Sequence, residues 1–141
     1  MKIKILDNFL NSQDLEELNN LIIPSVKDTD IKIHHNNISN DKIISTSCLN
    51  VDFLKRLHKN YHQTALNILE ELNSEKKNLY DYSDFHIIET GKKFKFPIHD
   101  DVPEKILSGV IYLKPEKNLG TVFYSNKKGD NRKEIKWKIN R

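Results

Sequence analysis

The chain has 141 residues, and its 23 basic and 20 acidic side chains leave a formal net charge of only +3. That excess is too small to indicate a nucleic-acid-binding protein on charge alone. Hydrophobic residues make up 37% of the chain and charged residues 30%, and no run approaches the roughly 20 apolar residues of a membrane-spanning helix. We therefore expect one domain over residues 1–141, with no membrane partner.

The number of cysteines bears on whether the protein works in a reducing or an oxidising compartment. Cys48 is the only cysteine, so an internal disulfide is excluded. This suits a reducing compartment, and the N-terminal segment has no apolar run of signal-peptide length. The sequence therefore predicts a cytoplasmic protein.

The first elements are a short strand and a helix. Residues 2–6 alternate polar and apolar side chains, which predicts a strand. Asn11 or Ser12 can cap a following helix that runs to about Ile23. Pro24 should end it, because proline disfavours helical backbone in the residue before it.

The middle of the chain holds the clearest helix signal. Residues 28–41 are polar with little periodicity, which indicates a loop, and residues 42–51 carry enough aliphatic side chains for a strand. Apolar residues then recur at helical spacing over residues 52–72, and Asp52 is a suitable N-cap. One face of this helix is apolar, so we expect it to pack across a sheet.

The second half of the chain is predicted to be rich in strands. Four segments contain many β-branched and aromatic residues, and turn-forming residues separate them. They are residues 84–90, 106–113, 121–124 and 134–139. Helices followed by strands indicate an α+β fold, with the helices covering one face of an antiparallel sheet.

His99 and Asp101 form the main candidate site. In an extended segment, side chains two residues apart point to the same side of the backbone, so this imidazole and this carboxylate can share a divalent metal. Residues 106–113 follow and would give the site a rigid apolar backing. A His-x-Asp triplet is also common by chance, and the alternative is an exposed polar turn after Pro97.

The segments on either side of the His-x-Asp triplet are more specific evidence for a protein family than the triplet itself. A strand with a glycine turn precedes it, a Lys-x-Leu-Ser-x-x-x-Tyr-Leu strand follows, and a Gly-Thr-x-Phe-Tyr strand comes next. These segments are residues 85–91, 94–101, 105–113 and 119–124. In this order they resemble the iron(II)- and 2-oxoglutarate-dependent dioxygenases, in the prolyl 4-hydroxylase-like branch. The resemblance implies a double-stranded β-helix, or jelly-roll, core with the N-terminal helices packed on one sheet.

The same resemblance implies roles for three residues. His99 would be the first imidazole ligand and Asp101 the carboxylate ligand of an iron(II) site that uses two histidines and one carboxylate. The hydroxyl of Tyr112 would donate a hydrogen bond to the distal carboxylate of the cosubstrate, 2-oxoglutarate. The implied reaction is hydroxylation of a small-molecule or peptidyl substrate with molecular oxygen.

The sequence departs from the family pattern at several positions. Glu89 stands where some relatives have a tyrosine, and Leu119 stands where many have the first glycine of a pair. The second histidine ligand is expected beyond Arg141, so we expect a jelly-roll that is incomplete at its C-terminus. The alternative function is therefore a catalytically inactive binding or scaffold domain that lacks a complete metal site.

The other histidines are interpreted structurally. His58 and His62 are four apart on the long helix, and a solvated helix face is the favoured interpretation. His34 and His35 are expected to be exposed in a polar loop. His86 is expected to be a hydrogen-bonded structural histidine, although its predicted strand could point it inward.

The basic C-terminal end is the last feature of note. Residues 127–141 are rich in lysine and arginine and include Trp137. Basic residues beside an aromatic ring can bind single-stranded nucleic acid. An exposed hairpin whose lysines protect its edge is the favoured interpretation, so nucleic acid is not an expected partner.

Overall fold

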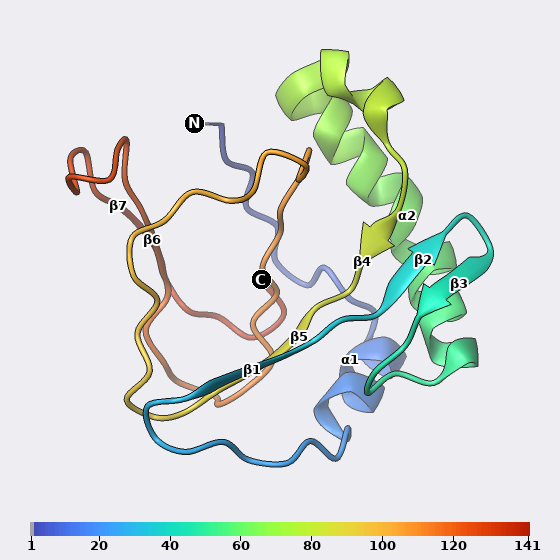
Figure 1. Cartoon of the computed structure of the whole chain (residues 1–141), viewed down its shortest axis with the longest axis horizontal. Coiled ribbons are helices and arrows are strands. Elements are labelled where there is room, and N and C mark those ends of the chain that lie inside the picture. The colour runs from blue at the N-terminus through green and yellow to red at the C-terminus, as the bar shows by residue number, and fades with distance from the viewer. Residues whose placement is uncertain (1) are drawn as a thin grey trace. The chain divides into compact units, whose positions relative to one another are not determined.

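The structure, a computed structural model, describes residues 2–141 and mixes helices with small antiparallel sheets (Figure 1). This confirms the predicted α+β composition. The chain forms two units: one takes residues up to Asn20 together with Pro97–Arg141, and the other is Leu21–Phe96. No helix in the described part of the chain has the length and apolar character needed to cross a membrane.

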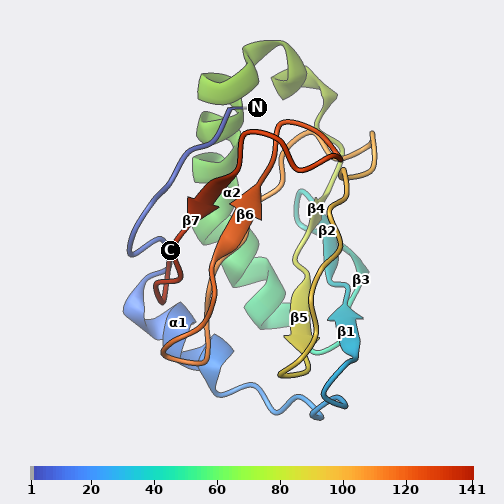
Figure 2. The same cartoon turned by 90° about the vertical axis from the view of Figure 1, so that its left-hand side faces the viewer.

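The second unit is built on two-stranded and three-stranded antiparallel pairings. Strand β1 (Ile31–His34) pairs with β5 (Ile87–Thr90), and Figures 1 and 2 show them side by side. Strand β2 (Asn37–Ser39) lies between β3 (Lys42–Ser45) and β4 (Ser83–Asp84).

The two pairings share one register. Ile31 faces Thr90 at one end, and Ile38 faces Ser83 at the other, seven residues further along each strand. Between them, the Phe85 amide donates to the Asn36 carbonyl at 2.8 Å. Residues 31–38 and 83–90 therefore follow each other as one antiparallel ladder.

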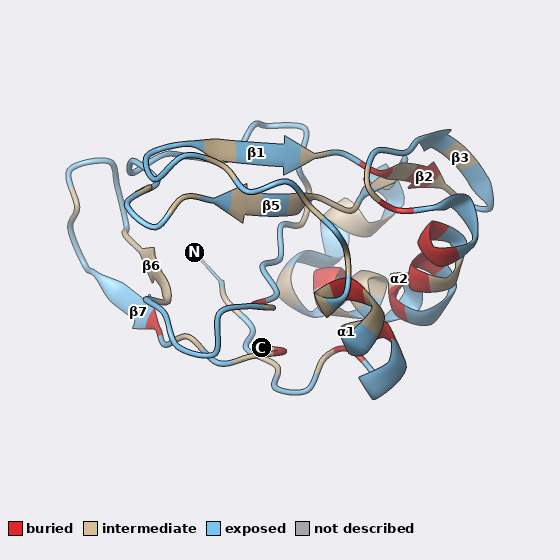
Figure 3. Cartoon of the chain, turned by 90° about the horizontal axis from the view of Figure 1, so that it is seen from below, coloured by how far each residue is buried: buried red, intermediate tan, exposed pale blue. Residues whose placement is uncertain are grey.

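Helix α2 (Val51–Asn73) supplies the core of this unit. The Asn50 side chain caps it by accepting from the Phe53 amide at 2.8 Å. The predicted long helix is therefore confirmed and begins one residue earlier, but the predicted cap was wrong, because Asp52 lies within the first turn. Its buried face shows as the red stretches of α2 in Figure 3. The buried apolar side chains of the unit are Ile38, Leu49, Phe53, Leu54, Leu57, Tyr61 and Leu69. A short 3₁₀ helix, Ser74–Leu79, follows α2.

Two predictions for this unit need correction. The loop predicted over residues 28–41 contains β1 and β2. β1 pairs with β5 and β2 with β4, some fifty residues away, so local periodicity could not indicate these pairings; β2 also pairs with the neighbouring β3. The strand predicted over residues 42–51 is present only as β3, because the chain turns into α2 directly afterwards.

Helix α1 (Ser12–Asn19) belongs to the first unit and is capped by Asn11, whose side chain accepts from the Asp14 amide at 2.8 Å. It ends four residues before the predicted Ile23. Asn19 is its last residue, and asparagine is a weak helix former whose side chain competes for backbone hydrogen bonds.

The first unit also holds the hairpin of β6 (Thr121–Phe123) and β7 (Lys133–Ile135), which lie side by side in Figure 2. The strands predicted over residues 2–6 and 106–113 were wrong, since neither segment enters a described sheet. Within the second segment, Tyr112 alone exchanges backbone hydrogen bonds with residues 140–141, which is too short a pairing for a strand.

Candidate functional site

His99 lies in an exposed, irregular segment of the first unit that follows Pro97. Its Nδ1 is 2.8 Å from the Pro97 carbonyl oxygen. A carbonyl can only accept, so Nδ1 carries a proton, and in the neutral ring the lone pair is therefore on Nε2. A backbone carbonyl that fixes the tautomer in this way is the usual support of a metal-binding histidine.

Asp101 lies on the same segment, and its carboxylate is 3.1 Å from the Lys105 ammonium. Partial burial raises the pKa of Asp101, but hydrogen bonds from Lys105 and Ser108, with the charges of Lys105 and His99, lower it further than burial raises it. The carboxylate therefore stays ionised at neutral pH. His99 and Asp101 both lie in a segment without regular secondary structure, and their joint role as metal ligands stays a prediction.

Tyr112, the predicted cosubstrate contact, is buried in the first unit. Its hydroxyl donates to Thr121 Oγ1 at 2.6 Å and accepts from the Thr121 amide at 3.0 Å. Its ring stacks on Trp137 with the centroids 4.4 Å apart. The role of Tyr112 toward 2-oxoglutarate stays a prediction, and in this structure its one hydroxyl proton goes to Thr121.

A second group of metal-type ligands lies in the other unit. The Asp84 Oδ2 atom is 2.9 Å from His35 Nδ1 and 2.6 Å from His86 Nε2. The two imidazole rings meet edge to face with their centroids 4.4 Å apart. Among residues 2–141, no other group of three histidine, cysteine or acidic side chains brings its ligand atoms this close, within 4.8 Å.

The ladder explains why these three side chains meet. Continuing its register places His35 directly opposite His86, and Asp84 is one step away on the same face, because side chains alternate along a strand. The Asp84-x-His86 spacing was visible inside a predicted strand. The contribution of His35 was missed because residues 28–41 were predicted to be a loop.

Asn37 orients the Asp84 carboxylate. With its amide nitrogen turned toward Asp84, Asn37 donates to Oδ1 at 2.8 Å and to Oδ2 at 3.0 Å, and its carbonyl oxygen accepts from Ser45 Oγ at 3.2 Å. Asn37 pairs with Asp84 in the ladder, so backbone and side chain fix the carboxylate together.

His58 and His62 differ from the prediction of a solvated helix face. The side chain of His58 is buried, with 6% of its surface exposed, and its ring stacks on His62 at 4.4 Å between centroids. Tyr80 covers the pair, with its hydroxyl 3.5 Å from His58 Nε2. Burial lowers the pKa of both histidines, and the charge of His62 lowers that of His58 further.

This pair should make the stability of the second unit depend on pH. The folded state holds both pKa values below the ordinary 6.5, so the unfolded chain binds more protons once the pH falls through that value. We expect full stability above about pH 7 and a decrease as the pH falls toward the folded-state pKa values. Urea unfolding followed by far-UV circular dichroism checks this.

The matched variant replaces both side chains with neutral amides, His58→Gln with His62→Gln. We expect it to be less stable at neutral pH but to lose less stability on acidification than the unsubstituted protein. If acidification lowered the free energy of unfolding equally in both proteins, groups other than His58 and His62 would cause the acid sensitivity.

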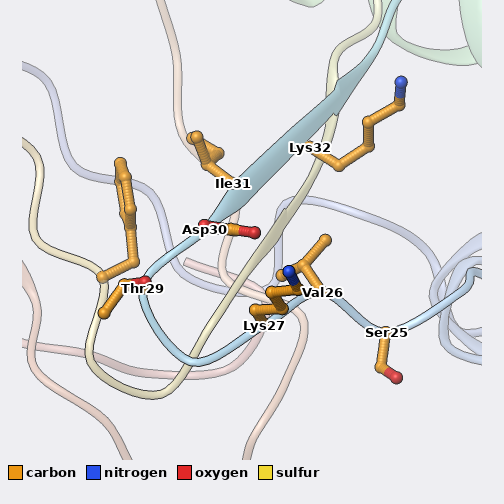
Figure 4. Close-up of a pocket in the computed structure, with 8 residues that line it drawn as sticks. Ser25, Val26, Lys27, Thr29, Asp30, Ile31 and Lys32 are labelled. Carbon is orange, nitrogen blue, oxygen red and sulfur yellow. The ribbon is translucent and has the colours of Figure 1, made fainter.

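The second unit also carries an open surface depression near β1 (Figure 4). It is lined by Ser25, Val26, Lys27, Thr29, Asp30, Ile31, Lys32 and Phe94. None of the predicted or observed metal-type ligands lines it, so it adds nothing to the candidate sites.

Comparisons with protein-family models, with curated proteins and with solved structures found no match.

Proposed function

We propose that this chain is an iron(II)- and 2-oxoglutarate-dependent dioxygenase of the prolyl 4-hydroxylase-like kind, with a jelly-roll core. His99 and Asp101 supply two of the iron ligands. The observation that carries the proposal is the order of sequence motifs from residue 85 to residue 124, which includes the His-x-Asp triplet. The single cysteine suits the cytoplasm as the place of this activity.

The donor chemistry of the two residues fits iron(II). The Pro97 carbonyl holds His99 in the tautomer that presents Nε2 as a ligand, and the lowered pKa of Asp101 keeps its carboxylate in the ligand form. Iron(II) and 2-oxoglutarate, when bound, supply the oxygen-activating chemistry for hydroxylation of a small-molecule or peptidyl substrate. For Asp101 to serve as a ligand, its ion pair with Lys105 must be loosened.

A paired substitution tests the proposed ligands. Asp101→Asn removes the carboxylate, whereas Asp100→Asn alters the neighbouring carboxylate, which pairs with Lys127 at 3.1 Å instead. We expect Asp101→Asn to weaken Mn²⁺ binding, measured by calorimetry as a stand-in for iron(II), by at least about tenfold. Asp100→Asn should leave it nearly unchanged.

The same variants test the reaction. Iron(II)-dependent release of succinate from 2-oxoglutarate is expected in the unsubstituted protein and in Asp100→Asn, and loss of this release is expected in Asp101→Asn and His99→Ala. The proposal fails if Mn²⁺ affinity is the same in Asp100→Asn and Asp101→Asn.

One observation favours a second candidate function, a catalytically inactive binding or scaffold domain. Among residues 2–141, no third histidine, cysteine or acidic side chain completes a close ligand group with His99 and Asp101. An absence of succinate release, together with a Mn²⁺ affinity that Asp101→Asn leaves unchanged, would support this candidate.

A further inference from the structure

We propose that His35, Asp84 and His86 form a separate site for a divalent transition metal, with zinc as the representative ion. The site lies wholly within the second unit and is independent of the proposed dioxygenase site. Two imidazoles and one carboxylate converge there on one face of the antiparallel ladder.

The donor atoms are already gathered. Asp84 Oδ2 lies within 2.9 Å of a nitrogen from each imidazole, and all three ligand atoms lie within 4.8 Å of one another. In tetrahedral zinc sites, nitrogen and oxygen ligands lie about 2.0–2.2 Å from the ion, so ligand atoms stand about 3.3 Å apart. A cation can therefore take the place of the imidazole protons that now face Asp84, which move to the other ring nitrogen or to solvent. The two oxygen–nitrogen distances then lengthen by less than about 1 Å, and the two nitrogens, which lie within 4.8 Å of each other, settle at about 3.3 Å.

The arrangement is held by backbone pairing. His35 and His86 lie opposite each other in the ladder, and Asp84 is paired with Asn37. Asn37 donates to both oxygens of Asp84 and is itself held by Ser45. A hydrogen-bonded carboxylate ligand on a rigid strand is the support that metal sites usually have.

The site is accessible and has space for further ligands. The side chains of His35, Asp84 and His86 are 54%, 23% and 24% exposed. Three protein ligands with an open position toward solvent are typical of zinc sites that also bind water. Imidazole with carboxylate favours zinc, nickel, copper and cobalt over calcium or magnesium.

The competing explanation is a hydrogen-bonded ion pair in which Asp84 only fastens the two strands. Both explanations predict that the three side chains contact one another. Only the metal site predicts a saturable affinity for an added ion that depends on all three ligands. Metal binding itself must therefore be measured.

The experiment is zinc titration of the full chain by calorimetry, with Co²⁺ absorption as a report on coordination. We expect one equivalent of Zn²⁺ at this site and ligand-field bands of low symmetry with Co²⁺. His35→Gln, His86→Gln and Asp84→Asn keep the side-chain size and can still hydrogen-bond, and each should weaken zinc binding at least tenfold. Asn37→Ala, which removes only the orienting amide, should weaken it by about 10-fold to 100-fold.

His99→Ala is the matched control, since it removes an imidazole from the other proposed site. It should leave the affinity for zinc at the second-unit site unchanged, and His86→Gln should leave succinate release unchanged. Folding of each variant is checked by circular dichroism. The inference is overturned if zinc does not bind, or if His86→Gln binds zinc as tightly as the unsubstituted protein while folding normally.

Discussion

Replacing Asn36 with leucine is expected to lower the free energy of unfolding of the second unit by about 4 kcal/mol. The Asn36 side chain is fully buried. Its carbonyl oxygen accepts from the Ser47 and Leu49 amides at 2.8 and 3.3 Å, and its amide nitrogen donates to the carbonyls of Phe85 and His34 at 3.1 and 3.3 Å. Leucine fills a similar volume but leaves these buried backbone groups without a partner.

Urea unfolding followed by far-UV circular dichroism is the measurement, because α2, the longest helix, lies in this unit. Asn67→Ala is the matched control, since Asn67 is exposed on α2 and its side chain accepts from the exposed Gln63 at 2.9 Å. It should change the free energy of unfolding by no more than about 0.5 kcal/mol. Similar effects of the two substitutions would contradict the role assigned to Asn36.

The same residue connects stability to the second-unit metal site. Asn36 lies between His35 and Asn37, and its side chain spans the two strands that carry the site. We therefore expect Asn36→Leu to weaken zinc binding as well, although it removes no ligand.

Local information was sufficient for α2. Its apolar residues recur at helical spacing over more than twenty positions, and Asn50 supplies a cap. The short strands β1 and β2 could not be predicted in this way, because each has a partner far along the chain, and β2, which also pairs with the neighbouring β3, has three residues. The strand predicted over residues 106–113 shows the converse, since a favourable composition without a paired partner leaves the backbone irregular.

The two candidate sites differ in the same way, in how far apart their residues lie in the sequence. His99 and Asp101 are two residues apart, so sequence alone could place them together. The Asp84–His86 pair was equally visible, but the third ligand, His35, is brought in by the register of the ladder. Sequence patterns thus predicted contacts within one segment, and the fold supplied those that connect segments.

Replacing Asn140 with alanine is expected to lower the free energy of unfolding of the first unit by about 3 kcal/mol, which is the second large effect. The buried side chain accepts from the Leu10 amide at 2.7 Å and donates to the Leu10 carbonyl at 2.8 Å. Its backbone has φ of 60°, in the left-handed region that asparagine and glycine tolerate better than alanine. The Asn140 amide also donates to the Tyr112 carbonyl at 2.8 Å, so one residue joins three segments.

Trp137 is the only tryptophan and stacks on Tyr112, so its fluorescence reports the unfolding of this unit in urea. Asn140→Gly keeps the backbone freedom and removes the side-chain bonds, and it should be about 1 kcal/mol more stable than Asn140→Ala. Asn118→Ala, in an exposed loop, is the control and should shift the urea unfolding transition little.

If Asn140→Gly were as stable as the unsubstituted protein, the two hydrogen bonds to Leu10 would contribute nothing to stability. If glycine and alanine were equally destabilising, the left-handed backbone would carry no cost, and the effect would come from the lost hydrogen bonds alone.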